Sequence, residues 1–253
     1  MKSVHALIGL VGLLAVALSA EQSDAAQTNV AVAANFTDAA TEIAAAFKHK
    51  TGHEAVLSFG SSGALYTQIT QDAPFQIMLS ADTERPKKLV DDGLGVADSR
   101  FTYAIGKLVL WSKNPDLVKG DGTLKNATFA KLSICDPVAA PYGAAAVETM
   151  KSLKLYDALQ PKLVQGANIS QAFQFVDTGN AEVGFVAASQ LIDRGGSRWV
   201  VPQNLYEPIR QDAVLLKKGA GNEAAVAFMK FLKGPEAHAI IEKYGYAFDT
   251  GKS

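Results

Sequence analysis

The sequence predicts an α/β protein of two lobes, each with a mixed sheet and helices on its faces, joined by two crossing strands. Short apolar runs alternate with runs of helical period along most of the chain. Such alternation indicates strand–helix–strand units, which form largely parallel sheets covered by helices. The alternation starts afresh after a longer apolar run at 101–111, and this restart predicts the second lobe.

The first part of the chain predicts strands that are each followed by a helix. The strand candidates are 29–33, 55–59 and 75–79, and the helix candidates that follow them are 37–47, 64–70 and 83–90. In the first helix, Ile43 and Phe47 recur at helical spacing. Asn35 stands where a residue that caps the beginning of this helix belongs.

The remainder of the chain repeats the pattern. Its strand candidates are 132–135, 183–187, 198–201 and 211–216, and its helix candidates are 143–153, 170–178, 222–232 and 235–244. The long strand at 101–111 and the strand at 211–216 are the candidates for crossing between the lobes. We therefore expect a discontinuous first lobe, 27–107 with 211–253, and a second lobe, 108–210.

The N-terminal segment predicts export. Lys2 precedes an apolar run, Val4 to Ala20, which has small residues near its end. This pattern is typical of a secretory signal peptide, here 1–26, although cleavage after residue 19 or 20 also fits. Cys135, the single cysteine, lies far from the position of a lipid anchor and has no partner for an intramolecular disulfide. We expect a protein of the periplasm without a lipid anchor.

The charge balance argues against a nucleic-acid partner. The formal net charge is −1, and 19% of the residues are charged. A nucleic-acid-binding protein would carry a basic excess or a basic block, and neither is present in the sequence.

Four neutral junctions, at or beside the beginnings of predicted helices, form the candidate binding site. They lie at Asn35, Ser61-Ser62-Gly63, Pro141-Tyr142-Gly143 and Asn168-Ile169-Ser170. In open α/β sheets, ligands bind beyond the carboxyl ends of strands, where helices begin. Each helix beginning offers unpaired N–H groups and about half a positive charge. Several together can bind an anion without Lys or Arg.

Short motifs follow one another along the mature chain. They are VAVAANFT at 30–37, SFGSSG at 58–63, SAD at 80–82, CDP at 135–137 with PYG at 141–143, and FLKGPEA at 231–237 followed by YGY at 244–246. In this order they resemble the periplasmic molybdate-binding proteins of ABC importers. The last motif is shared with other oxyanion binders.

This resemblance implies a type II periplasmic-binding-protein fold, whose lobes close on molybdate or tungstate, and a membrane permease as the partner. It implies no cofactor and no direct ligand to a metal cation, since the metal is bound as its oxyanion. The family's donors correspond to Asn35 and the Ser62 hydroxyl, and to main-chain N–H groups at Tyr142-Gly143 and Ile169. We expect a carrier that is not an enzyme and is monomeric.

One position departs from the family pattern. Some members have a tyrosine hydroxyl where this chain has Ala187, whose side chain has no donor. Tyr142 stands where those members have a small residue. Our hypothesis is that the Tyr142 hydroxyl replaces the missing donor from another wall of the cleft.

Other interpretations remain. The same fold could bind sulfate, phosphate or a small organic anion, or serve as a sensor domain, although no DNA-binding module is apparent. A hydrolase would use Ser62, since residues 60–64 approach a nucleophile elbow, but its base would have to be His238 in a terminal helix. His49 and His53 are four positions apart and could bind a metal from one face of a helix. However, Gly52 lies between them, and no carboxylate pattern accompanies them.

Overall fold

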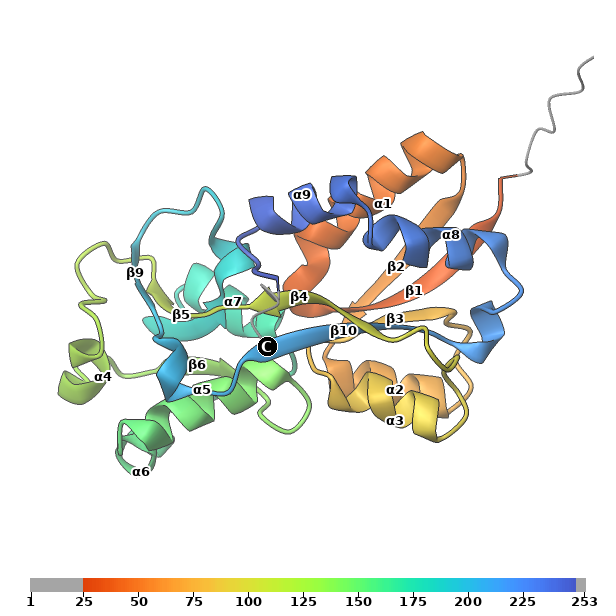
Figure 1. The fold of residues 1–253 in the computed structure, drawn as a ribbon. Coiled ribbons are helices and arrows are strands. Elements are labelled where there is room, and N and C mark those ends of the chain that lie inside the picture. The colour runs from red at the N-terminus through yellow and green to blue at the C-terminus, as the bar shows by residue number, and fades with distance from the viewer. Residues whose placement is uncertain (1–24, 249–253) are drawn as a thin grey trace, which may run out of the picture.

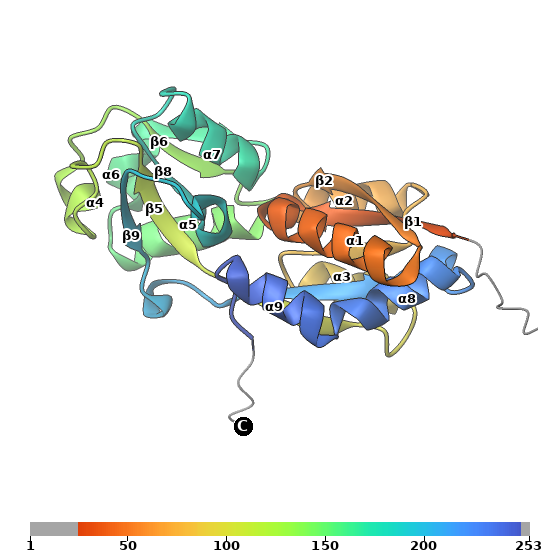
Figure 2. The same ribbon diagram turned by 90° about the horizontal axis from the view of Figure 1, so that it is seen from above.

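The computed structural model describes residues 25–248, which form two lobes lying side by side (Figures 1 and 2). Each lobe contains a five-stranded sheet, with the orders β2-β1-β3-β10-β4 and β7-β6-β8-β5-β9. We name the lobes first and second after these sheets. The predicted signal peptide lies almost wholly outside the described residues. Within 25–248, none of the helices has the length and apolarity needed to cross a membrane.

The first sheet is parallel in its outer part and antiparallel toward β4. Its strands are β1 (Gln27–Ala33), β2 (Glu54–Gly60), β3 (Ile77–Leu79), β4 (Phe101–Gly106) and β10 (Ile209–Leu215). β1 pairs in parallel with β2 and β3, whereas β10 runs antiparallel to β3 and β4. The sheet is therefore mixed, and a strand from late in the chain, β10, lies between β3 and β4.

Helices cover both faces of the first sheet (Figure 1). They are α1 (Thr37–Thr51), α2 (Ser62–Thr70), α3 (Glu84–Asp91), α8 (Glu223–Leu232) and α9 (Pro235–Lys243). Because side chains alternate along a strand, Val30 and Val32 of β1 pack in the core beneath α1, α8 and α9. Ala31 packs on the opposite face with Leu65 of α2 and Leu89 of α3.

The second sheet is built entirely from the middle of the chain. Its strands are β5 (Leu108–Ser112), β6 (Leu132–Cys135), β7 (Leu163–Gly166), β8 (Val183–Ala187) and β9 (Ser197–Val200), and its helices are α4 (Gly122–Asn126), α5 (Pro141–Ser152), α6 (Tyr156–Leu159) and α7 (Ile169–Asp177). β5 again alternates: Leu108 and Leu110 join the core that contains α5. Val109 and Trp111 join the core that contains Val176 of α7.

The chain crosses between the lobes in short segments. Lys107 alone separates β4 in the first sheet from β5 in the second. The return runs from the end of β9 at Val200 to the beginning of β10 at Ile209. The single strand predicted at 101–111 is therefore wrong, because the apolar pattern continues through the crossing while the pairing partners change.

Three regular elements lacked a clear signal in the sequence. β7 is short, lies at the edge of its sheet and is half-exposed along most of its length. α4 and α6 have five and four residues, too few for a helical period to repeat. Of the three, β7 matters for the site, because it leads into the junction at Asn168 and Ile169.

Candidate functional site

The four neutral junctions meet in one pocket between the lobes. Asn35, Ser62, Tyr142 and Ile169 all line it, and its cavity volume is only about 10 Å³. A volume of this size holds about one water molecule, so the pocket suits a small, compact ion. Its lining consists of Ala33, Ala34, Asn35, Gly60, Ser61, Ser62, Ala81, Ala140, Pro141, Tyr142, Asn168 and Ile169, with no charged side chain.

Helix beginnings supply most of this lining. Ser62 opens α2, with Ser61 as its cap, and Ile169 opens α7, with the Asn168 side chain accepting the N–H of Gln171. Tyr142 is the second residue of α5. The first N–H groups of a helix have no partner within the helix and carry a partial positive charge. The pocket therefore presents donors and a positive potential without a cation.

Ser62 is arranged to donate. Its side chain is buried, and its Oγ accepts the main-chain N–H of Ala81 at 2.9 Å. Since that contact uses the oxygen as an acceptor, the hydroxyl proton is left for another partner. Among the described hydrogen bonds, none has Ser62 Oγ as the donor, so the proton is available to an anion in the pocket.

The Asn35 side chain was expected to donate to the ligand, but its amide is already hydrogen-bonded within the protein. Its Nδ2 donates to Gln211 Oε1 at 2.8 Å and to the Tyr246 hydroxyl at 3.0 Å. An amide nitrogen carries two hydrogens, and both are used within the protein. The donor that Asn35 has left is its main-chain N–H, at the beginning of the 3₁₀ turn Ala34–Phe36.

Tyr142 is buried, and its hydroxyl accepts from Gln211 Nε2 at 3.3 Å. Burial, with a smaller contribution from neighbouring tyrosines, raises the pKa of the Tyr142 hydroxyl well above its usual value. The group therefore keeps its proton at neutral pH. It lies against Gly106, where a Cβ would come within 2.1 Å of the hydroxyl oxygen, so this position of β4 has room only for glycine.

Sequence reasoning missed the buried polar residues behind the pocket. Gln211, Tyr103 and Tyr246 are buried, and the Tyr103 hydroxyl donates to Gln211 Oε1 at 3.1 Å. Tyr246 donates to the main-chain oxygen of Asn35 at 2.7 Å. The available signal was Gln211-Asp212 at the start of an otherwise apolar strand, since polar residues are seldom buried unless they are hydrogen-bonded.

Hydrogen bonds join the lobes around the pocket, so the structure is closed. Gly63 N donates to Ala139 O at 2.9 Å, and Arg85 Nη2 donates to Val138 O at 2.8 Å. On the other side, Ser170 Oγ donates to Ala34 O at 3.2 Å, and Ser189 Oγ donates to Asn35 O at 2.8 Å.

Among the described residues 25–248, the side chains that a hydrolase or a metal site would need do not come together. Ser62 Oγ accepts the Ala81 N–H and has no described bond to a histidine, and the His238 ring packs on Phe248. His53 Nδ1 accepts the N–H of Ala26. Within residues 25–248, no group of three or more His, Cys, Asp or Glu side chains is placed to hold a metal ion.

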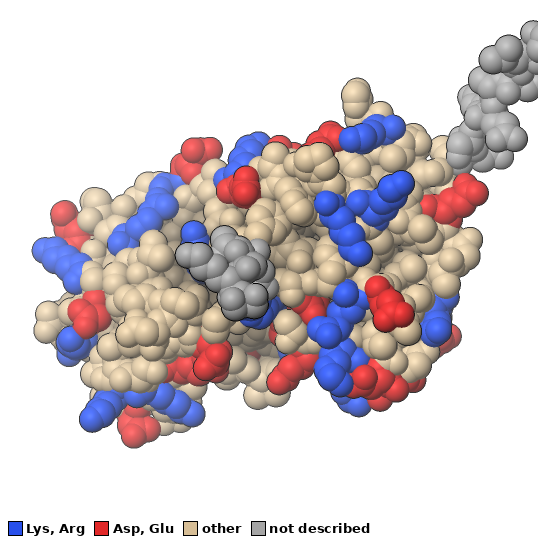
Figure 3. Space-filling view, in the orientation of Figure 1, with Lys and Arg blue, Asp and Glu red and all other residues tan. Residues whose placement is uncertain are grey.

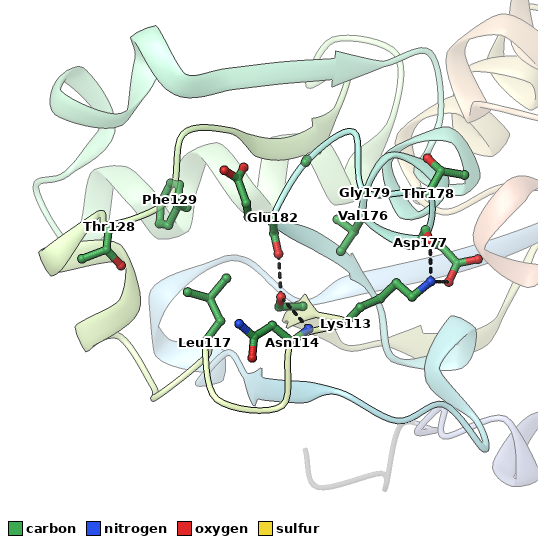
Figure 4. A pocket seen from close by; sticks show the side chains of 12 residues that line it. Lys113, Asn114, Leu117, Thr128, Phe129, Val176, Asp177, Thr178, Gly179 and Glu182 are labelled. Atoms are coloured by element: carbon green, nitrogen blue, oxygen red, sulfur yellow. Dashed lines mark hydrogen bonds and ion pairs between the residues drawn. The ribbon is translucent and has the colours of Figure 1, made fainter.

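A second cavity, of about 490 Å³, opens at the far end of the second lobe (Figure 4). Its charged groups already have partners. Lys113 Nζ donates to the main-chain oxygen of Asp177 at 2.6 Å, and the Glu182 carboxylate accepts the N–H groups of Ala130 and Lys131. None of the predicted site residues lines it.

On the molecular face in Figure 3, acidic and basic side chains are interspersed.

Comparison with known proteins covers nearly the whole chain. The family described as bacterial extracellular solute-binding protein matches residues 28–247. The molybdate-binding protein ModA of Rhodobacter capsulatus is 57% identical over 223 residues, which are 88% of this chain and 88% of that protein. ModA of Azotobacter vinelandii is 53% identical over 242 residues, which are 94% of this chain and 96% of that protein.

Solved structures agree with the two-lobed architecture. The periplasmic molybdate-binding protein of Azotobacter vinelandii matches with a TM-score of 0.85 at 42% identity, over 87% of this chain and 99% of that chain. The fold class predicted from the sequence is thereby confirmed. The sulfate-binding protein SubI of Mycobacterium tuberculosis matches with a TM-score of 0.73 at 12% identity, over 89% of this chain and 88% of that chain. That likeness concerns the fold alone.

Proposed function

Because the chain belongs to the family of bacterial extracellular solute-binding proteins, we propose that it captures molybdate in the periplasm for import by an ABC transporter. The observation that carries the proposal is the convergence of four uncharged helix-start junctions on one small pocket. Relatives with more than half of their residues identical are molybdate-binding proteins. Tungstate, an anion of the same shape and charge, belongs to the proposed ligand set.

The anion is held by hydrogen bonds alone. We assign donation to the Ser62 and Tyr142 hydroxyls and to the main-chain N–H groups of Asn35, Tyr142 and Ile169. A hydrogen bond to a charged group contributes roughly 1.5–3 kcal/mol net. Several such bonds together offset the cost of removing water from a dianion, provided that each donor meets an oxygen.

Closure of the lobes completes this donor set. Ser62 and Asn35 lie on the first lobe, whereas Tyr142 and Ile169 lie on the second. The open form therefore offers only part of the set, and the anion favours the closed form because it binds that form more tightly. Hinge closure of this type is an established class of domain motion.

Anion size accounts for selectivity in this proposal. A smaller tetrahedral anion such as sulfate cannot reach donors that the closed lobes hold in fixed places. Buried donors left without acceptors cost about 1–3 kcal/mol each. We therefore propose that sulfate and phosphate bind much more weakly than molybdate.

The expected lobes of this carrier are 27–107 with 211–253 and 108–210, with the difference that β10 begins at Ile209, so residues 209 and 210 belong to the first sheet. The carrier is a monomer free in the periplasm, without a lipid anchor, and its closed form docks on the membrane permease. The single cysteine, Cys135, is buried in β6 and is remote from the N-terminus in sequence, which supports the absence of an anchor.

Calorimetry on ligand-stripped protein tests the function directly. Molybdate and tungstate should bind one per chain, whereas sulfate and phosphate should give no saturable heat at the same concentrations. The Ser62→Ala variant should bind molybdate about 10-fold or more weakly, since one hydrogen bond to the anion is lost. Saturable binding of sulfate or phosphate in preference to molybdate would replace this assignment with another oxyanion.

A further inference from the structure

Gln211 lies at the point where the chain re-enters the first lobe. It belongs to β10, and the pairing of β10 with β4 shifts register between Gln211 and Asp212. Its side chain is fully buried. A buried amide is stabilised only when its donors and acceptors find partners, and those partners come from both lobes.

The Gln211 amide links two residues of the proposed site. Oε1 accepts from Asn35 Nδ2 at 2.8 Å and from the Tyr103 hydroxyl at 3.1 Å. On its other side, Nε2 donates to the Tyr142 hydroxyl at 3.3 Å. Asn35 lies in the first lobe and Tyr142 in the second, so this set of bonds is complete only when the lobes are closed.

The orientation of the amide is determined by its neighbours. Rotating the amide by half a turn would place Nε2 against Asn35 Nδ2, which is also a donor. The arrangement with Oε1 toward Asn35 avoids that clash and directs Nε2 toward Tyr142. In this arrangement the Tyr142 oxygen acts as an acceptor toward Gln211.

This contact determines what the Tyr142 hydroxyl can offer a ligand. Its oxygen accepts from Gln211, and no described hydrogen bond has Tyr142 as the donor. The hydroxyl proton is therefore left for an oxygen in the pocket that Tyr142 lines. Without Gln211 the buried hydroxyl could rotate and take other partners.

We propose that Gln211 is a positioning residue that fixes the Tyr142 hydroxyl as a hydrogen-bond donor to the bound oxyanion. This inference rests on the proposed function of the pocket. Gln211 acts through Tyr142 and is not itself a contact of the anion. A structural role alone would give no coupling between the two residues in ligand affinity.

A double-mutant cycle measured by molybdate calorimetry tests the proposal. Tyr142→Phe and Gln211→Met should each weaken binding by about 10-fold or more, the loss expected for one hydrogen bond to a charged group. In the Tyr142→Phe background, Gln211→Met should change the affinity by no more than about twofold, the usual scatter for independent sites. Losses that multiply in the double variant would overturn the proposal.

Two further variants complete the experiment. Gln211→Glu keeps the size and the acceptors but has no N–H donor when ionised, so Tyr142 would donate to the carboxylate and molybdate should bind more weakly than to Gln211→Met. An affinity equal to that of the wild type would contradict the proposal. Ser112→Ala removes another buried hydroxyl, one that donates to Glu182 O at 2.6 Å in the second lobe, and should leave the affinity unchanged.

Titration of the wild type with molybdate distinguishes failure of the proposed function from failure of the role proposed for Gln211. If the wild type fails to bind molybdate, the proposed function is wrong. If the wild type binds molybdate and all Gln211 variants bind it equally well, only the role of Gln211 is wrong. Thermal unfolding of each variant, recorded without ligand, shows that the affinities refer to folded protein.

Discussion

The Arg85 guanidinium in the first lobe donates a hydrogen bond to the main-chain oxygen of Val138 in the second lobe, with Nη2 and O 2.8 Å apart. Arg85 is held in place by an ion pair with Asp82, one helical turn before it. Neither residue lines the small pocket. The contact therefore stabilises the closed form without touching the ligand.

Replacing Arg85 should accelerate ligand release. Arg85→Met removes the bond from the charged guanidinium to Val138. Because this contact is exposed, its net contribution is near the lower end for a charged donor, about 1.5 kcal/mol, which corresponds to roughly 10-fold faster dissociation of molybdate. Stopped-flow displacement measures this rate. Lys88→Met, in the same helix and paired with exposed Asp92, is the matched control and should dissociate at the wild-type rate. Equal rates for both variants would show that Arg85 does not hold the lobes together.

Gly63→Ala should separate helix stability from ligand affinity. At this second position of α2, a Cβ would lie 3.0 Å from Ala139 Cα and 3.1 Å from its oxygen, across the lobe boundary. Alanine favours the helix by up to about 1 kcal/mol, so the open form should not be destabilised. In the closed form the added methyl group would press against Ala139. This overpacking should cost roughly 1 kcal/mol, so molybdate should bind several-fold more weakly.

Thermal unfolding and calorimetry on the same Gly63→Ala sample check this pair of expectations. Gly122→Ala is the control, because a Cβ at Gly122 in α4 meets nothing within 4 Å. It should affect neither closure nor affinity. If Gly63→Ala binds molybdate as tightly as the wild type, then the segment at Ala139 shifts to accommodate the methyl group and the prediction is wrong.

Thr28→Val should stabilise the protein. Thr28 is fully buried in β1, and its Oγ1 makes no hydrogen bond among the described residues. Removing an unsatisfied buried hydroxyl should raise the free energy of unfolding by about 1 kcal/mol, and the Tm by roughly 2–4 °C. Thr149→Val serves for comparison, since Thr149 Oγ1 donates to Ala145 O at 2.8 Å. A gain in Thr149→Val as large as in Thr28→Val would contradict this reasoning.

Alkaline pH should destabilise the protein partly through Cys135. Burial raises the pKa of the Cys135 thiol from 9.0 to about 12. Between these values the unfolded chain loses the proton first, so the stability present below pH 9 is lost as the pH rises. Between pH 8 and 10.5 this group alone should lower the free energy of unfolding by about 2 kcal/mol.

Urea unfolding at both pH values, with wild type and Cys135→Ala, measures that contribution. The variant is expected to start less stable, because a buried side chain is truncated, yet to lose less stability on going to pH 10.5. Buried tyrosines such as Tyr103 and Tyr142, whose pKa values are also raised by burial, titrate in both proteins and cancel in the difference. Parallel losses in the two proteins would assign the whole effect to other groups.

The sequence predicted the junctions of the site because their signals are local. Ser62 follows a short apolar strand and precedes a run of helical period, and Ile169 opens such a run after Asn168, a residue typical of helix starts. The rule that ligands bind where helices begin beyond strand ends needs no knowledge of the tertiary contacts. The residues behind the pocket have no such signal. Asn35 and Tyr246 are 211 positions apart in the chain, yet they are hydrogen-bonded. No periodic pattern relates positions so distant.

The sequence also could not predict whether a candidate donor is free to bind a ligand or is already hydrogen-bonded within the protein. An asparagine at a helix start was expected to donate to the ligand, but Gln211 and Tyr246 take both of its amide hydrogens. Residue 107 was expected as the end of the first lobe, but the division of 101–111 into two strands at Lys107 was missed because apolar residues continue on either side of it. In both cases the deciding partner lies in a distant segment of the chain.

The place of β10 between β3 and β4 has a consequence for the order in which the protein can form. A chain that emerges from an export channel with its N-terminus leading exposes every strand of the second sheet before residues 209–215 arrive. Until then the first sheet lacks the strand that joins its two parts, and its long-range pairing carries the entropy cost of a large open loop. We therefore expect the second lobe to fold earlier during secretion, whereas the strands of the first sheet complete their pairing only after β10 has emerged.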